Sequence, residues 1–155
     1  TLETVHLAIL EGTDVLYLDK IDSPQPVRAY TRIGGRAPAY CVATGKVLLA
    51  CATEAGRRIP EKLVAHTKHT LVDRAALNRE LARVREQGYS VNRGEWREGV
   101  CGVGAPVFDA SGKAIAAVGI SGPAARFNAA SVRKFAPLVI EVAASFSADL
   151  GYRPR

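Results

Sequence analysis

The chain is poor in the residues on which disulfide frameworks, metal centres and membrane spans depend. Its 155 residues include three cysteines, three histidines and no methionine. No apolar run reaches the roughly 18 residues that cross a bilayer, so no membrane contact is expected. An odd number of cysteines without close pairing favours reduced thiols in the cytoplasm. The lack of methionine and the start at Thr1 suggest a fragment of a longer protein.

Charge gives only a weak indication of nucleic-acid binding. The net charge is +6, from 21 basic and 15 acidic residues, but the basic residues are scattered and interleaved with acids. This pattern is more typical of a solvated mixed surface than of a DNA-binding groove. Hydrophobic residues make up 48% of the chain, which is ample for one packed domain over residues 1–155.

Alternating polarity predicts strands in the first part of the chain. Residues 5–21 alternate apolar and polar side chains on both sides of Gly12, which indicates a hairpin. A third strand is expected over residues 26–33. A short buried helix is expected from Thr44 to about Thr53, with Thr44 as its N-cap.

An amphipathic helix is predicted in the middle of the chain, between an N-cap at Asp73 and a C-cap at Gly88. It follows an irregular stretch, residues 54–72, with one helical turn near Lys62. A strand over residues 89–96 should come next.

The last part of the chain predicts a second hairpin, over residues 98–123, with its turn at Ser111 and Gly112. A helix should follow Asn128 and be kinked at Pro137. Its expected apolar face consists of Phe135, Leu138, Val139, Val142 and Phe146. Consecutive hairpins predict an α+β domain with a mainly antiparallel sheet and helices packed on it.

Two motifs resemble nucleotide-binding or catalytic sites but lack required residues. The segment around Gly45 and Lys46 lacks the loop glycine and the following hydroxyl of a phosphate loop. Its helix N-terminus is either a carboxylate site or an ordinary helix end. Ser121 lacks both a nearby base and the glycine two residues later that a serine nucleophile needs. Ser121 is therefore either a pocket hydroxyl or a plain strand residue.

The other reactive side chains do not form a catalytic set. His66 and His69 are interpreted as solvated loop residues, and His6 as structural. Cys101 is expected to be a small apolar filler rather than a reactive thiol. Glu95 has no second titrating group beside it in the sequence. No catalytic residue, metal or cofactor is therefore expected.

Small residues dominate the hairpin over residues 98–123. Glycine, alanine and serine on its strands are too small to fill a core, so they predict a cavity for a small ligand. Trp96, just before the hairpin, is either a lid over this cavity or a core anchor.

Several stretches resemble the effector-binding domain of the IclR family. They are RIGGRAPAYCVATGKVLLA at residues 32–50 and the segment from Gly88 to Pro123, with softer likeness at residues 3–23 and 132–152. The resemblance implies a GAF-like fold and a bacterial transcription regulator that senses a small organic or aromatic acid. It implies a homodimer or tetramer that contacts DNA only through an N-terminal winged helix-turn-helix domain, which is absent from this chain.

The same resemblance implies the residues that contact the ligand, which are Ala29, Ala37, Ala43, Thr44, Asn92, Gly102, Gly119 and Ser121. Gly102 and Gly119 stand where the family often has cysteine and serine. We therefore expect a roomier, more apolar pocket that suits an aromatic or branched acid better than a two-carbon acid. Strand alternation should point Cys101 to the face opposite Gly102.

Other classes of function give distinct expectations. A small enzyme on a similar fold would use Cys101, and a pure dimerisation module would have a filled core and no cavity. Direct nucleic-acid binding would make retention of this chain on DNA sensitive to salt.

Overall fold

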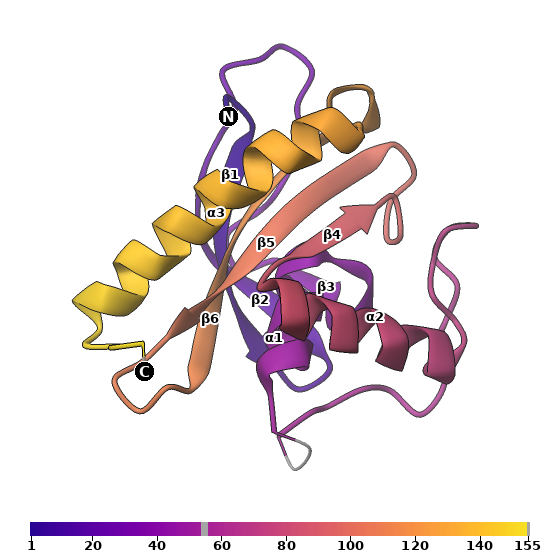
Figure 1. The fold of residues 1–155 in the computed structure, drawn as a ribbon. Coiled ribbons are helices and arrows are strands. Elements are labelled where there is room, and N and C mark those ends of the chain that lie inside the picture. The colour runs from indigo at the N-terminus through magenta and orange to yellow at the C-terminus, as the bar shows by residue number, and fades with distance from the viewer. Residues whose placement is uncertain (54–55, 155) are drawn as a thin grey trace.

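The computed structural model describes residues 1–53 and 56–154, and its centre is a six-stranded antiparallel sheet (Figure 1). The strand order is β3-β2-β1-β6-β5-β4. The strands are β1 (Thr4–Glu11), β2 (Asp14–Ile21), β3 (Arg36–Pro38), β4 (Ser90–Arg93), β5 (Val100–Phe108) and β6 (Ala114–Pro123). The helices are α1 (Ala43–Cys51), α2 (Arg74–Gln87) and α3 (Ala129–Asp149), with short 3-10 turns η1 (Ala39–Cys41) and η2 (Ala124–Arg126). The predicted α+β class is confirmed.

Helices cover both faces of the sheet, because alternate side chains along each strand point to opposite sides. On one face α3 packs over β5 and β6, against a core that includes Val103, Val107 and Val118 (Figure 1). On the other face α1 packs against β1, β5 and β6, and α2 packs against α1. Among the described residues, no helix combines the length and the apolarity that a bilayer crossing requires.

The small residues of the second hairpin bring α1 close to the sheet. A β-carbon on Gly104 would lie 3.0 Å from the amide nitrogen of Thr44, and one on Gly119 would lie 2.6 Å from the Thr44 methyl carbon. Such distances are far below van der Waals contact, so larger residues would push the helix away. At these two positions the small residues therefore serve helix packing rather than leave an empty space.

Both hairpins and both longer helices lie where the sequence predicts them. The Asp73 carboxylate accepts a hydrogen bond from the Ala76 amide at 2.8 Å, and Gly88 has the left-handed φ of 79° that a C-cap requires. The Asn128 side chain caps α3 through the Ser131 amide at 2.9 Å. The helix α3 continues through Pro137.

The predicted strand over residues 26–33 is wrong. These residues form an irregular strap without strand pairing, and the strand that pairs with the edge of β2 is β3, opposite Asp14–Leu16. The amide of Gly34 donates to the carbonyl of Tyr17 at 2.8 Å, and the Tyr17 amide donates to Gly35 at 3.0 Å. These bonds bring the chain back to β2 only after the strap has passed over the sheet.

Smaller corrections concern three helices and one strand. The N-cap of α1 is Val42, so Thr44 lies inside the first turn. Residues 61–62 form a bend rather than a helical turn, and β4 ends at Arg93, where Gly94 takes a φ of 73°. On α3 only part of the expected apolar face is buried, and the exposed members are Leu138, Val142 and Phe146.

Candidate functional site

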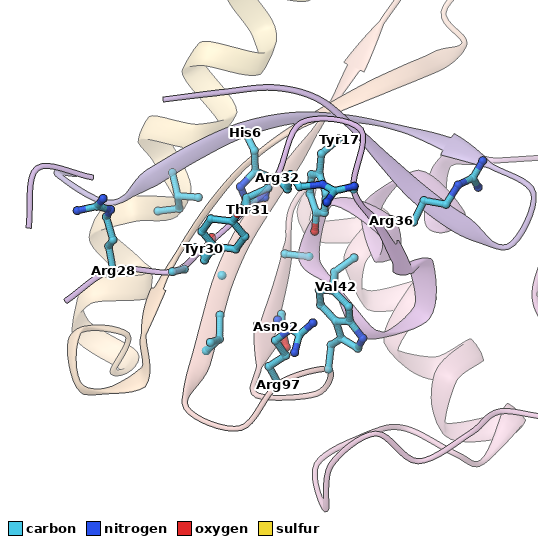
Figure 2. A pocket seen from close by; sticks show the side chains of 18 residues that line it. His6, Tyr17, Arg28, Tyr30, Thr31, Arg32, Arg36, Val42, Asn92 and Arg97 are labelled. Carbon is cyan, nitrogen blue, oxygen red and sulfur yellow. The ribbon is translucent and has the colours of Figure 1, made fainter. Parts of the chain in front are cut away.

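A cavity of about 510 Å³ lies between the sheet and the strap, beyond the N-terminus of α1 (Figure 2). The helix α1 covers the sheet as far as Gly104, and the next part of the same face is roofed by the strap. The wall consists of His6, Tyr17, Arg28, Ala29, Tyr30, Thr31, Arg32, Gly35, Arg36, Val42, Ala43, Asn92, Trp96, Arg97, Val100, Gly102, Ile120 and Ser121.

Five of the eight predicted ligand contacts line this cavity, and they come from five different segments. They are Ala29, Ala43, Asn92, Gly102 and Ser121. The other three, Ala37, Thr44 and Gly119, are buried but do not form its wall. The fold therefore brings most of the predicted set together around one space, while their contact with a ligand stays a prediction.

The expectation that Gly119 enlarges the pocket is wrong. The space beside Gly119 is already filled by neighbouring side chains. A β-carbon at this position would lie 2.9 Å from Nε2 of His6, in addition to its short distance to the Thr44 methyl carbon. Gly102 does line the cavity, but a β-carbon on it would lie 2.6 Å from the carbonyl oxygen of Ile120. Glycine at position 102 therefore has two effects. It permits the close approach of β5 to β6, and it leaves space in the cavity that its backbone lines.

Positive charge surrounds the cavity, which is more polar than the sequence suggested. Among the described residues on its wall, four are arginines and none is acidic. The arginines are Arg28, Arg32, Arg97 and Arg36, whose guanidinium is already paired with the exposed Glu11 carboxylate. The first backbone bond of α1 runs from the Lys46 amide to the Val42 carbonyl, so the amides of residues 43–45 precede the helical ladder. Because Val42 and Ala43 line the cavity, the positive end of the α1 dipole adds to the field there.

The first half of the strap is fastened by polar contacts. The Thr4 hydroxyl donates to the carbonyl of Ala29 at 3.1 Å, and the Arg126 guanidinium donates to the carbonyl of Val27 at 2.8 Å. Arg126 is itself held by the buried Glu3, through bonds of 2.6 and 2.8 Å. These contacts fix the roof of the cavity to the start of β1.

A buried cation behind the cavity wall was not foreseen. Lys46 is 1% exposed, and its Nζ donates to Oε1 of Glu95 at 2.8 Å, to the Val91 carbonyl at 2.7 Å and to Glu80 at 3.2 Å. A lysine at the start of the apolar segment KVLLA was the available signal, because a buried lysine almost always has partners. In the sequence, Lys46 stood out only as part of an incomplete phosphate-loop motif.

This cluster shapes the wall of the cavity through Glu95. The Glu95 amide donates to Oδ1 of Asn92 at 2.9 Å, and the Thr70 hydroxyl donates to the Glu95 carbonyl at 2.6 Å. The next residue, Trp96, packs against the core, as expected of a core anchor, and it also lines the cavity, while its role as a lid stays a prediction. The guanidinium of Arg97 lies 4.3 Å from the centre of the Trp96 ring.

The pKa values of the two acids in the cluster are shifted in opposite directions. Burial raises the pKa of Glu95 above its ordinary value, although Lys46 opposes the shift. Burial also acts to raise the pKa of Glu80, but Lys46 and Arg83 outweigh it, so the pKa of Glu80 is lowered. Glu95 therefore does have a titrating partner, and the partner comes from α1 rather than from its own neighbourhood in the sequence.

His6 also lies on the cavity wall, although the sequence suggested a structural role. Its ring packs edge-on against Tyr17 with 5.0 Å between centroids. Burial lowers the pKa of His6 to about 4 and raises the pKa of Tyr17 to about 12, so both rings are neutral near pH 7. The nearby Thr44 hydroxyl acts to lower the pKa of Tyr17, but burial outweighs it. The hydroxyl oxygen of Thr44 has no hydrogen-bond partner among the described residues.

The remaining reactive groups lie away from the cavity. Cys101 faces α3, opposite Gly102, and burial raises the pKa of its thiol. His66 contacts the Tyr40 hydroxyl through Nε2 at 3.3 Å. Within residues 1–53 and 56–154, no three metal-ligating side chains gather at one place.

A second hollow, of about 560 Å³, lies between α2, β5 and α3. Its polar groups are already bonded within the protein. Ser147 donates to the Ala143 carbonyl at 2.7 Å and accepts from the Phe108 amide at 2.9 Å, and Arg85 donates to Ala50 at 2.8 Å. The first cavity is the better candidate, because its wall combines apolar surface with polar side chains that converge from several segments.

Comparison with known proteins gives a consistent family. Residues 1–148 match the family described as "Bacterial transcriptional regulator IclR C-terminal". The HTH-type transcriptional regulator KdgR of Escherichia coli is 38% identical over 155 residues, which cover 98% of this chain and 59% of KdgR. The chain thus spans a little over half the length of this curated relative.

Solved structures agree with this match. The structure of Thermotoga maritima IclR superimposes with a TM-score of 0.90 at 34% identity, over 97% of this chain and 62% of that chain. A double mutant of the PobR inducer-binding domain from Acinetobacter, in complex with 3-hydroxybenzoic acid, gives a TM-score of 0.85 at 25% identity, over 95% and 89% of the two chains. The expected GAF-like fold is confirmed.

Proposed function

Because this chain belongs to the IclR family of bacterial transcriptional regulators, as its C-terminal domain, we propose that the cavity under the strap binds a small organic or aromatic acid. The observation that carries the proposal is a cavity whose wall includes Arg28, Arg32 and Arg97 and no acidic side chain among the described residues, with the N-terminus of α1 beside it. Its volume of about 510 Å³ falls in the range of small-molecule sites and exceeds the needs of a two-carbon acid. The 3-hydroxybenzoic acid bound by the PobR domain supports this ligand class.

Ligand binding would act by population shift. The ligand would contact the strap, the α1 N-terminus and the β4–β5 wall together, and would favour the arrangement in which they surround it. In a homodimer or tetramer in the cytoplasm, this shift would move N-terminal DNA-binding domains attached ahead of Thr1. Coupling of this kind is commonly worth about 1–3 kcal/mol, and it is limited by the difference in ligand affinity between the two states.

Titration calorimetry with charged and neutral forms of the same ligand tests the proposal. We expect benzoate, 3-hydroxybenzoate and six-carbon sugar acids to include binders, and the matching amides to bind at least tenfold more weakly, because the arginines need a carboxylate. Arg97→Gln should weaken the acid by about tenfold, since a hydrogen bond to a charged group is lost.

Arg133→Gln is the matched control, because Arg133 is exposed on α3, on the far face of the sheet. This variant makes the same change of charge and should leave affinity unchanged. Equal binding of acids and amides, or equal losses in both variants, would contradict the proposal.

The structure does not favour an enzyme that uses Cys101. The thiol lies on the side of β5 that faces α3, and its raised pKa keeps it protonated near neutral pH. We expect Cys101→Ala to keep the acid affinity of the parent within about twofold, since nothing in the cavity is removed. Calorimetry on both proteins is the measurement, and loss of binding without loss of fold would revive the role of the thiol.

A further inference from the structure

His6 is a buried polar side chain whose Nδ1 makes no hydrogen bond within the described part of the protein. It is 6% exposed, and it lines the cavity. In β1 it shares a face with Thr4 and Ala8, which are fully buried. A buried polar atom without a partner is destabilising, and native proteins rarely keep one without a reason.

The ring is held firmly in place by its neighbours. Tyr17 packs against it edge-on at an interplanar angle of 82°, and the bare backbone of Gly119 leaves room for it on the other side. A β-carbon at position 119 would meet both His6 and the methyl group of Thr44. The imidazole is therefore presented to the cavity in a defined position, which is what a selective contact requires.

The charges nearby decide what kind of group His6 can meet. The strap supplies Arg28 and Arg32, and the opposite wall supplies Arg97, so an imidazolium would add a positive charge to a positive site (Figure 2). Tyr17, which packs against the ring from β2, and Thr44 of α1, which lies beside the same Gly119 backbone as the ring, carry no charge. The arginines are the stronger partners for a carboxylate, because they offer charged, bidentate hydrogen bonds. A neutral imidazole, with one donor and one acceptor nitrogen, is left for an uncharged polar group.

The cavity also has two separate polar ends. In Figure 2, His6 and Tyr17 project into the cavity from the strands β1 and β2, and Asn92 and Arg97 approach it from the opposite side. A ligand that spans the cavity would therefore meet polar groups at both ends.

We propose that His6, beside Tyr17, is a specificity-determining residue that hydrogen-bonds a hydroxyl or carbonyl oxygen of the effector, apart from its carboxylate. This inference rests on the proposed function and narrows its ligand class to acids that carry a second, uncharged polar group. An acid without that group offers no hydrogen bond to the part of the imidazole that lines the cavity, and it therefore binds more weakly.

Matched pairs of acids in titration calorimetry test the proposal. The pairs are 3-hydroxybenzoate and 4-hydroxybenzoate against benzoate, and gluconate against hexanoate. We expect at least one hydroxylated acid to bind about tenfold more tightly than its parent. In His6→Phe, which keeps an aromatic ring without nitrogen, this preference should fall to about twofold or less while the parent acid binds as before. Tyr17→Phe tests the neighbouring hydroxyl in the same way.

The outcomes separate this inference from the proposed function. If no acid of any pair binds, the proposed function itself fails, and the inference falls with it. If acids bind but the parent does so as tightly as the hydroxylated form, or if His6→Phe keeps the preference, only the role of His6 is overturned. His6→Phe could instead weaken the binding of both acids of a pair equally. If calorimetry in buffers of different ionisation enthalpy also showed that the parent protein takes up a proton on binding, His6 would lie against the carboxylate. That result would also overturn the proposal.

A measurement on the parent protein covers the case in which His6→Phe does not fold. The ¹⁵N resonances of the His6 imidazole should report a neutral ring from pH 6 to 8, with and without ligand. They should shift when the hydroxylated acid is added and stay nearly unchanged with its parent. The same shift with both acids would overturn the proposal.

Discussion

Lys46→Met is expected to destabilise the domain by about 3–5 kcal/mol, the usual cost of removing one partner from a buried ion pair. Methionine has a similar volume, so packing around α1 is largely kept. The lost ammonium is the donor to Glu95, to Glu80 and to the Val91 carbonyl. Glu95 would retain only the Arg93 amide, at 3.3 Å, as a partner for its buried carboxylate, whose Oε2 is unpaired among the described residues.

The loss of stability in Lys46→Met should depend on pH, and the direction of this dependence follows from the raised pKa of Glu95. Burial already raises this pKa, and without Lys46 nothing from α1 opposes the shift. A group with a raised pKa in the folded state favours folding at low pH, and this contribution is lost as pH rises through the folded pKa. The cost of Lys46→Met should therefore be smaller at pH 5 than at pH 8.

Urea unfolding of four proteins measures both effects. They are the parent, Lys46→Met, Glu95→Gln and the double variant. The double variant should recover part of the loss, because it removes the carboxylate that the single variant leaves unpaired. A cost for Lys46→Met below about 1 kcal/mol, or one that is equal at both pH values, would show that the buried pair does not hold α1 to β4. Acid binding should also weaken, since Glu95 positions Asn92 and Trp96.

Local signals in the sequence were sufficient for much of the fold. The caps at Asp73 and Gly88, the start of α3 after Asn128 and the turns of both hairpins depend on residues close together in the chain. Each lies where it was predicted. The strap over residues 26–33 was mistaken for a strand because its polarity alternates. Alternation alone does not determine pairing, and β2 pairs instead with β3, through Asp14–Leu16.

The site was predicted less completely, because its key contacts join distant residues. Lys46 and Glu95 are 49 positions apart, and only the packing of α1 against the end of β4 brings them together. Alternation suggested only a structural role for His6, and it could not distinguish a core from a cavity on the face where His6 is buried. The role of Gly119 was misjudged for a related reason, since a missing side chain leaves a space only where no neighbour fills it.

Gly45→Ala is the second change with a large expected effect, and here two physical effects have opposite signs. Alanine is favoured over glycine inside a helix by about 1 kcal/mol, so intrinsic preference predicts a more stable α1. A β-carbon on Gly45, however, would lie 2.6 Å from the carbonyl carbon of Ala39 and closer still to its oxygen and Cα. These are backbone atoms of η1, which cannot turn aside as a flexible side chain could.

The clash should outweigh the helical preference. Relief requires α1 to move away from η1, and α1 is also fixed by Gly104 on β5 and by the bonds of Lys46. Overpacking of a rigid core costs about 1–3 kcal/mol or more, so a net loss of at least about 2 kcal/mol is expected, together with weaker acid binding as Val42 and Ala43 move.

Ala82→Gly in α2 provides the calibration, because Ala82 is exposed in a helix interior and reports the intrinsic preference alone. It should lose about 1 kcal/mol in the same urea titration. If Gly45→Ala instead gained what Ala82→Gly loses, α1 would have to be free to shift against η1. The N-terminus of α1 would then not be a fixed wall of the cavity, and the account of acid binding at that helix end would fail with it.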